Sequence, residues 1–354
     1  MMAPIPWEKN SMTGSRISLK FMGKILQQPL PIRDGLNPTR ARVTPDMGPT
    51  RAEDLILELV MSQRHRHPSD DAAAVRARFS AGEVVLRDGT VLGPDDIVAV
   101  HSDVYFYRTP APEEPVPYSI VTVFEDENLL VVDKPPFLAT MPRASHITET
   151  ATVRLRRATG NSELAPAHRL DRLTSGILVF TTRRAVRGAY QRLFAERAVT
   201  KTYEAIAPLG EVQAPCTWTS RMTKVPGEIQ GHNHTDGEHN AVTACRSITP
   251  LSDAEQALVE AVHGPCPPLA RYELAPRTGK THQLRLHMLA AGVPILGDPV
   301  YPVTFPVDAE DMRLPMHLTA RSIAFDDPVT GEHRSFTTPL DLLDRLNEHP
   351  GETA

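Results

Sequence analysis

Short apolar runs bounded by polar residues recur along this chain, and they predict strands. Ile177–Phe180 is a continuous run of β-forming residues and predicts a buried strand. Residues 121–132 predict two more strands, and 199–206 alternates between apolar and polar positions as a half-buried strand does. Between these segments, apolar residues spaced three and four apart predict one face of a helix, formed by Val186, Ala189, Tyr190, Leu193 and Phe194.

The first third of the chain shows a different pattern. Thr50 and Glu53 have the spacing of a capping box and predict a helix through the apolar run that follows. A second short helix is expected to end near Phe79. Asp88-Gly89 lies between two short apolar segments and predicts a hairpin turn, and a further strand is expected over 97–107.

These elements suggest four regions. Residues 1–48 contain many Pro, Gly, Arg and Thr without a period and predict an extended or disordered arm. Residues 49–108 predict a small α+β module, and 109–117 form an acidic, proline-rich linker. The remaining residues, 118–345, predict one larger domain.

Composition narrows the class of protein. The 354 residues include 41% hydrophobic and 23% charged residues, which is typical of a globular protein, and no apolar run is long enough to predict a membrane span. Three cysteines without a C-x-x-C spacing argue against a disulfide framework or a structural zinc site, and they fit a reducing cytoplasm. Residues 231–239 hold several potential metal ligands, but their Asp-Gly pattern favours a hairpin loop over a metal site.

Charge is distributed unevenly. The net charge is −5, yet Ala151–Lys201 holds eleven basic and three acidic residues, a local charge of +8. Such a segment suits a nucleic-acid backbone. The alternative is an arginine-rich helix face that only contacts solvent.

One acid in this basic segment stands out. Asp171 lies between Arg169 and Arg172, just before the predicted buried strand, and Gly176 forms the joint. An aspartate beside fixed positive charge is expected to stay ionised, and at the mouth of a rigid strand it can act as a nucleophile. A structural salt bridge to one of the arginines is the alternative.

This segment resembles the signature motif of the RluA-type pseudouridine synthases, in which the aspartate is catalytic; the residues are His168-Arg169-Leu170-Asp171-Arg172-x-Thr174-Ser175-Gly176. A second resemblance covers 278–287, with Lys280 where the family usually has arginine. The charge is kept there, but the planar fork is lost. Together with Leu129–Pro136, the resemblance extends over about 118–339. The module at 49–108 weakly resembles the S4-like RNA-binding module, and a structural cap is an equal alternative.

The resemblance implies a fold and an activity. The fold should be α+β, with a mixed, largely antiparallel sheet, flanking helices and a central cleft. The reaction is the isomerisation of uridine in structured ribosomal or transfer RNA, which involves no redox change and consumes no net proton, so neither a cofactor nor a metal is implied. The protein is expected to act as a cytoplasmic monomer that binds RNA and needs no membrane or protein partner.

The resemblance also implies roles for single residues. Asp171 would be the nucleophile, Arg285 its ion-pair partner, and Tyr203 would pack against the target base. Arg169 would fill the space that a flipped base leaves. Further RNA contacts are expected from Arg172, Lys280, His282, Arg183 and Arg187.

Two other functions fit parts of the pattern. The first is an RNA-binding protein without activity, which would be indicated by loss of Asp171, Tyr203 or Arg285; all three are present. The second is a hydrolase that uses Asp171 or Ser175, but the Gly-x-Ser-x-Gly elbow is missing.

Overall fold

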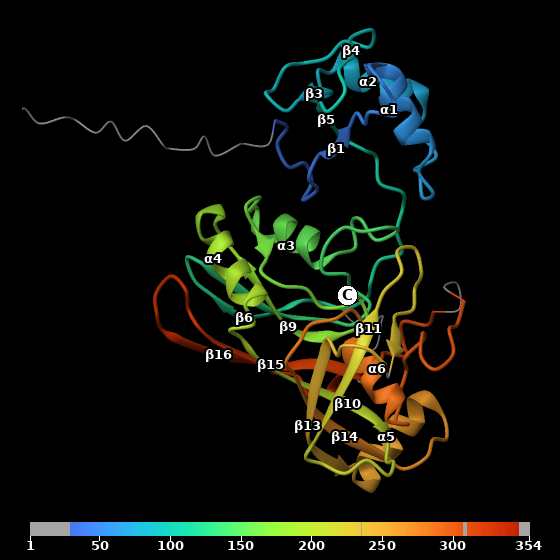
Figure 1. Cartoon of the computed structure of the whole chain (residues 1–354), viewed down its shortest axis with the longest axis vertical. Coiled ribbons are helices and arrows are strands. Elements are labelled where there is room, and N and C mark those ends of the chain that lie inside the picture. Colours follow the sequence, from blue (N-terminus) through green and yellow to red (C-terminus); the bar gives the residue numbers. More distant parts are fainter. Residues whose placement is uncertain (1–28, 235, 307–309, 347–354) are drawn as a thin grey trace, which may run out of the picture.

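A large sheet forms the body of the protein, and a small module lies beyond one side of it (Figure 1). The computed structural model describes residues 29–234, 236–306 and 310–346. Within these residues the body sheet has eleven strands in the order β12-β11-β13-β14-β10-β15-β9-β7-β6, with β16 beside β15 and β8 beside β9. Its pairs are antiparallel except β15 with β9, which is parallel. The predicted α+β fold with a largely antiparallel mixed sheet is confirmed.

The body strands and helices follow one another along the chain. The strands are β6 Val121–Glu125, β7 Leu129–Lys134, β8 Ala165–Pro166, β9 Ser175–Thr181, β10 Thr200–Pro208, β11 Cys216–Thr223, β12 His232–His234, β13 Ala241–Pro250, β14 Leu269–Pro276, β15 Leu318–Asp326 and β16 His333–Thr337. The helices are α3 Ala151–Thr159, α4 Arg184–Ala195, α5 Asp253–His263, α6 Gln283–Ala290 and the short 3₁₀ helix Asp344–Leu346.

The two faces of the sheet at β7 and β9 bury different helices. Every residue of both strands is buried, and alternate residues point to opposite faces. Leu130 and Leu178 pack with α3 and α6 on one face. Leu129 and Ile177 pack with α4 on the other, against Val186 and Tyr190 from the helix face that periodicity predicted. The central strands are thus fixed from both sides, which makes them a rigid support for the loop before β9.

The small module has its own core between two helices and short strands. Its elements are β1 Thr39–Arg42, β2 Thr50–Arg51, α1 Ala52–Met61, α2 Ala72–Ser80, β3 Val85–Leu86, β4 Ile97–Val98 and β5 Asp103–Phe106. The strands pair as β1-β5-β3 and β2-β4. Leu55, Ile56 and Phe106 are among the fully buried side chains of this core.

The start of the module differs from the sequence-based prediction. β1 falls within the range predicted as an arm, yet it pairs with β5 along four residues. The local sequence pattern did not predict this strand because its partner lies more than sixty positions later in the chain. We therefore propose that the module includes β1; residues 1–28 lie outside the described residues. The predicted capping box does not form either, since Thr50 lies in β2 and its hydroxyl donates to the carbonyl of Gly48.

The module is tied to the body by polar contacts. Arg156 of α3 is 8% exposed and donates to the carbonyls of Leu164 and Gly35, and Arg157 pairs with Asp34. None of the helices in the described residues has the length and apolar character needed to span a bilayer.

Candidate active site

Asp171 lies in the loop between β8 and β9, at the edge of a cavity of about 250 Å³. The cavity is also lined by Lys201 and Tyr203 of β10 and by the segment 276–285 that leads into α6. Within the described residues the Asp171 carboxylate makes no hydrogen bond or ion pair, and the neighbouring Arg172 pairs with Glu310 instead. The salt-bridge alternative raised from the sequence therefore has no support in this geometry.

The backbone on each side of Asp171 is held by buried groups. The hydroxyl of Thr140 donates to the carbonyl of Leu170 at 2.8 Å and accepts from the Leu170 N–H at 3.1 Å. Lys134 is fully buried, and its ammonium donates to three carbonyls, including that of Arg172 at 3.1 Å. Burial lowers the pKa of Lys134 well below its ordinary value. These contacts position the aspartate before any substrate arrives.

Gly176 at the start of β9 fits the tight approach that the sequence predicted. Its φ of +103° is in the region that favours glycine, and an added Cβ would lie 2.3 Å from the carbonyl oxygen of Ala320. Ala320 belongs to β15, the strand that pairs with β9 in parallel. The strand that follows the Asp171 loop is thereby locked against the strand next to it.

Arg285 does not pair with Asp171 as the resemblance implied. It is 3% exposed, and its Nε and Nη2 donate to the two carboxylate oxygens of Asp298 at 2.7 and 2.6 Å. Asp298 also accepts the backbone N–H groups of Val300 and Tyr301, so its carboxylate is bonded both to Arg285 and to the backbone. Burial acts to lower the pKa of Arg285, but the bond to Asp298 outweighs it with a contribution from Asp171, and the pKa is raised. The guanidinium is a fixed positive charge near Asp171, while its direct partner is Asp298.

Tyr203 faces the same cavity as Asp171. Its pKa is raised by burial and, to a smaller degree, by the nearby Asp171 carboxylate. The phenol therefore stays neutral at physiological pH and presents an apolar ring with a polar end.

His282 and Lys280 form part of the cavity wall before α6. His282 has a left-handed backbone (φ +57°), and its Nδ1 lies 2.9 Å from the hydroxyl of Tyr301. Burial lowers the pKa of His282 to about 4, with Arg285 adding to the effect, so the ring is neutral at physiological pH. Lys280 is exposed, and its backbone N–H donates to Gln283. Its ammonium makes no hydrogen bond or ion pair within the described residues, so it can reach the cavity mouth.

The four remaining arginines of the predicted RNA-binding set lie in different surroundings. Arg169 is exposed and lines the cavity without a hydrogen bond or ion pair in the described residues. Arg172 is held by Glu310 through both carboxylate oxygens. Arg183 pairs with Glu127, and Arg187 donates to the carbonyl of Glu163, so neither lines the cavity.

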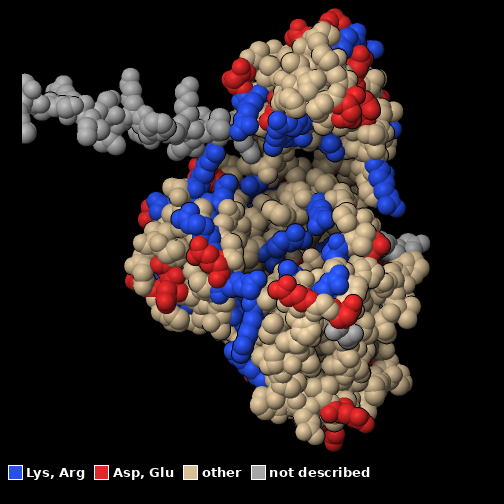
Figure 2. Space-filling model, viewed as in Figure 1, with Lys and Arg blue, Asp and Glu red and all other residues tan. Residues whose placement is uncertain are grey.

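A basic groove continues from the cavity. It has a volume of about 510 Å³ and shares Lys201 and Lys280 with the cavity. Its lining includes no acidic residue, while the positive side chains in it are Arg197, Lys201, Arg246, Arg277 and Lys280. Figure 2 shows Lys and Arg gathered in the hollow between module and body and along a band across the body. The positive surface predicted from the sequence is present, but α3 uses its arginines to bind other parts of the chain.

Sequence reasoning missed the residues that hold Arg285 in place. Asp298 and Tyr301 lie in the segment after α6, and the Tyr301 ring is 5.1 Å from the Arg285 guanidinium carbon. The available signal was the Gly297-Asp298 pair. Gly297 has a φ of +73°, and an added Cβ would lie 2.4 Å from the carbonyl oxygen of Pro315, so the turn that aims Asp298 requires glycine. Arg246, in the basic groove, had no local signal.

The histidine-rich segment forms strand pairing instead of a metal cluster. His232 lies beside Glu228 and His234 beside Thr223. Among the described residues, no group of three or more His, Cys, Asp or Glu side chains is placed to hold a metal ion.

Comparison with known proteins supplies the family. The family described as RNA pseudouridylate synthase matches residues 128–290, the part that contains Asp171, Tyr203 and Arg285. The dual-specificity RNA pseudouridine synthase RluA of Haemophilus influenzae is 34% identical over 229 residues, which cover 62% of this chain and 93% of that protein. The ribosomal large subunit pseudouridine synthase D of Zymomonas mobilis is 33% identical over 206 residues, covering 54% of this chain and 59% of that protein.

A solved structure, human RNA pseudouridylate synthase domain containing 1, aligns with a TM-score of 0.48 at 25% identity, covering 64% of this chain and 86% of that one. With the H. influenzae protein matched over nearly its whole length, the motif resemblance is confirmed. The chain belongs to the RluA-type family of RNA pseudouridine synthases.

Proposed function

We propose that this protein converts specific uridines to pseudouridine in structured ribosomal or transfer RNA, with Asp171 as the nucleophile. The observation that carries the proposal is the Asp171 carboxylate, which lines a cavity on a fixed loop without a partner of its own. A nucleophile must be free to meet substrate, and a structural carboxylate would be paired. The relatives named above include a ribosomal large subunit enzyme, which supports ribosomal RNA as one substrate class.

The reaction can be written with the groups present. Asp171 attacks C6 of the uracil or C1′ of the ribose, the C1′–N1 bond breaks, and the base turns. A C1′–C5 bond then forms, and the bond between Asp171 and the substrate breaks, which regenerates the carboxylate. C5 loses its hydrogen as a proton, and N1 gains one. The positive charge of Arg285, fixed by Asp298, stabilises the Asp171 anion in the cavity. Tyr203 packs its ring against the base, and its neutral phenol is suited to hold or pass a proton.

Positive side chains at the cavity mouth would handle the RNA. A uridine in a stem must leave the helix before it reaches Asp171, which costs a few kcal/mol. Arg169, exposed at the mouth, would occupy the vacated space, and Lys280 with the basic groove would bind neighbouring phosphates. His282 would contact the RNA as a neutral ring.

We also infer that the enzyme works as a monomer without a cofactor or protein partner, in the cytoplasm. The three cysteines are free, which suits a reducing compartment.

Tritium release from RNA containing C5-tritiated uridine tests the proposal, because C5 loses its hydrogen in the reaction. Bulk ribosomal RNA and bulk transfer RNA, each from cells lacking the enzyme, are offered separately to the wild type, Asp171→Ala and the control Asp326→Ala. Asp326 is an exposed acid at the end of β15, far from the cavity lining. We expect Asp171→Ala to lower release at least about 10³-fold while the control is unchanged. Equal release by Asp171→Ala would disprove the nucleophile, and no release by a folded, RNA-binding wild type would favour binding without catalysis.

A further inference from the structure

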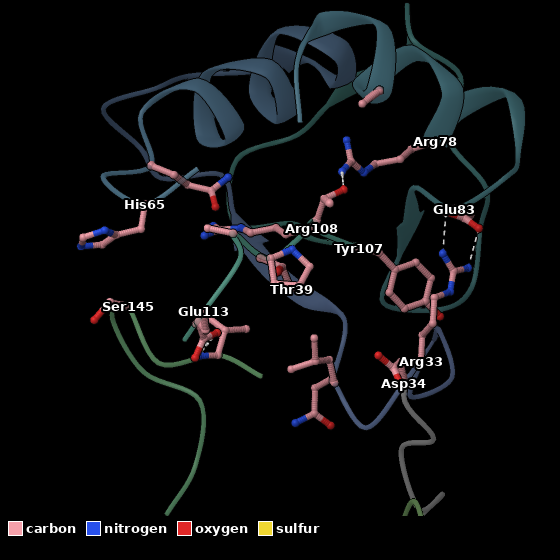
Figure 3. Close-up of a pocket in the computed structure, with 18 of the residues that line it drawn as sticks. Arg33, Asp34, Thr39, His65, Arg78, Glu83, Tyr107, Arg108, Glu113 and Ser145 are labelled. Carbon is pink, nitrogen blue, oxygen red and sulfur yellow. Dashed lines mark hydrogen bonds and ion pairs between the residues drawn. The ribbon is translucent and has the colours of Figure 1, made fainter. Parts of the chain in front are cut away.

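A second cavity lies outside the catalytic site. It has a volume of about 910 Å³ and opens between the small module and the body (Figure 3). The module supplies Arg64, Arg78 and Arg108, while the body supplies Ser145 from the loop after β7. We call this space the module cleft.

The acidic side chains of the module cleft are already engaged. Glu83 accepts both ends of the Arg33 guanidinium, and Asp34 pairs with Arg157 of α3. Glu113 accepts the backbone N–H groups of residues 147 and 148 at 2.8 and 2.7 Å. Two of the three acids are therefore paired with arginines, and the third is hydrogen-bonded by neutral groups.

Positive charge is left over in the same space. Arg64 and Arg108 make no hydrogen bond or ion pair within the described residues. Arg78 is 7% exposed, and its Nη2 donates to Asp70 and Thr109, but its buried Nη1 has no partner. Arg64 and Arg108 are exposed toward solvent, and partial burial lowers the pKa of Arg108. A guanidinium donor left unpaired under these conditions is stabilised by an anion.

The module cleft lies beside the catalytic loop. The segment 143–146 closes a small turn through paired backbone bonds, and Ser145 in this turn is among the residues that line the cleft. His146 in this turn is within electrostatic range of His65 in the module and of Arg172, the residue after Asp171.

We infer that the module cleft binds phosphates of the substrate RNA outside the modified nucleotide, and this inference rests on the proposed function. The cleft leaves several guanidinium groups free toward one space while its acids are satisfied, which matches a run of phosphodiesters better than a single small anion. It also assigns the module the role of an RNA-binding element instead of a structural cap.

The test measures RNA binding by the full chain as a function of salt. The cleft variant is Arg64→Gln with Arg108→Gln. The matched control is Arg42→Gln with Arg87→Gln, which removes the same charge from the same module near Asp103, outside the cleft lining. Both are made in wild-type and Asp171→Ala chains, and the probes are fluorescently labelled bulk transfer RNA and bulk ribosomal RNA.

We expect the cleft variant to bind roughly tenfold more weakly and to reduce the slope of log K against log salt by about 1.4 to 1.8, because two phosphate contacts are lost. The control should keep most of the wild-type slope. Ultraviolet cross-linking to RNA should identify peptides around Tyr107 and Ser145. An unchanged slope, or an equal loss in the control, would overturn the inference, and in the first case a protein partner becomes the occupant to pursue.

The two proposals can fail separately. If Asp171→Ala abolishes tritium release but the cleft variant binds like wild type, the function holds and the cleft inference is wrong. If the cleft variant loses binding while no variant or wild type releases tritium, the cleft binds RNA and the proposed function is wrong.

Discussion

The catalytic cavity and the module cleft both collect arginines, but they use them in opposite ways. In the cavity, Arg285 is buried and fully matched by Asp298, while the Asp171 carboxylate stays free. In the cleft, the acids are matched and Arg64 and Arg108 stay free. A reacting group must be free on a rigid frame, whereas binding a polyanion needs free cations. Both sites keep unpaired cations, and the unpaired Asp171 carboxylate is what distinguishes the cavity from the cleft.

The rigidity of the body and of the module can be compared by the same substitution, glycine to alanine, in each. Gly176→Ala would force a Cβ to within 2.3 Å of the Ala320 carbonyl at a positive φ, and we expect a loss of about 3 kcal/mol or more in the free energy of unfolding. Gly48→Ala in the module also has a positive φ but meets no atom within 4 Å, so about 1 kcal/mol is expected. Urea unfolding measures both. An equal loss of stability in the two variants would show that β9 and β15 can move apart without lowering the free energy of unfolding.

Acid should destabilise the body through its buried histidines. Burial lowers the pKa of His287 to about 4 and that of His317 to about 3, and the two side chains are 2% and 1% exposed. Because these rings take up protons in the unfolded chain from about pH 6.5 downward but not in the folded chain, stability is full above that pH and falls as pH decreases. These two rings contribute a slope of about 2 to 3 kcal/mol per pH unit near pH 5, and His168 and His282, whose pKa values burial lowers to about 3 and about 4, add to it.

Trp218 reports on this region, since its ring lies 6.2 Å from His287. In a Trp7→Phe background it is the single tryptophan, and its fluorescence follows urea unfolding of the body at each pH. His287→Gln should reduce the slope by about 1 kcal/mol per pH unit, the share of one ring. A flat profile between pH 7 and pH 5 would contradict the burial of neutral rings.

The smallest expected effect concerns the support of Asp171. Thr140→Val keeps the side-chain shape but leaves the Leu170 carbonyl and N–H without their partner, so we expect a loss of about 1 to 2 kcal/mol in stability. Because the Asp171 loop loosens, kcat should fall about tenfold with little change in KM.

Thr50→Val in the module is the matched control, since that hydroxyl also bonds a backbone carbonyl. It should cost similar stability and leave kcat unchanged. A fall in kcat for both variants, or for neither, would contradict the inference that Thr140 positions Asp171.

Local patterns in the sequence were sufficient for several features. The apolar run Ile177–Phe180 became the fully buried part of β9, and the spacing of Val186 and Tyr190 correctly marked the buried face of α4. The motif around Asp171 led to the family because its residues are contiguous. Such signals need only neighbours along the chain.

Other features were decided only by the tertiary structure. Pairing of β1 with β5, the choice of Asp298 over Asp171 as the direct partner of Arg285, and the use of Arg156 inside the fold all join residues that no local pattern connects. The module cleft is the clearest case, since its free arginines and satisfied acids come from separate segments. The sequence by itself determined which segments fold into buried strands and helices and which motif identifies the family. Only the tertiary structure decided which charges meet, because an ion pair depends on where the chain returns in space.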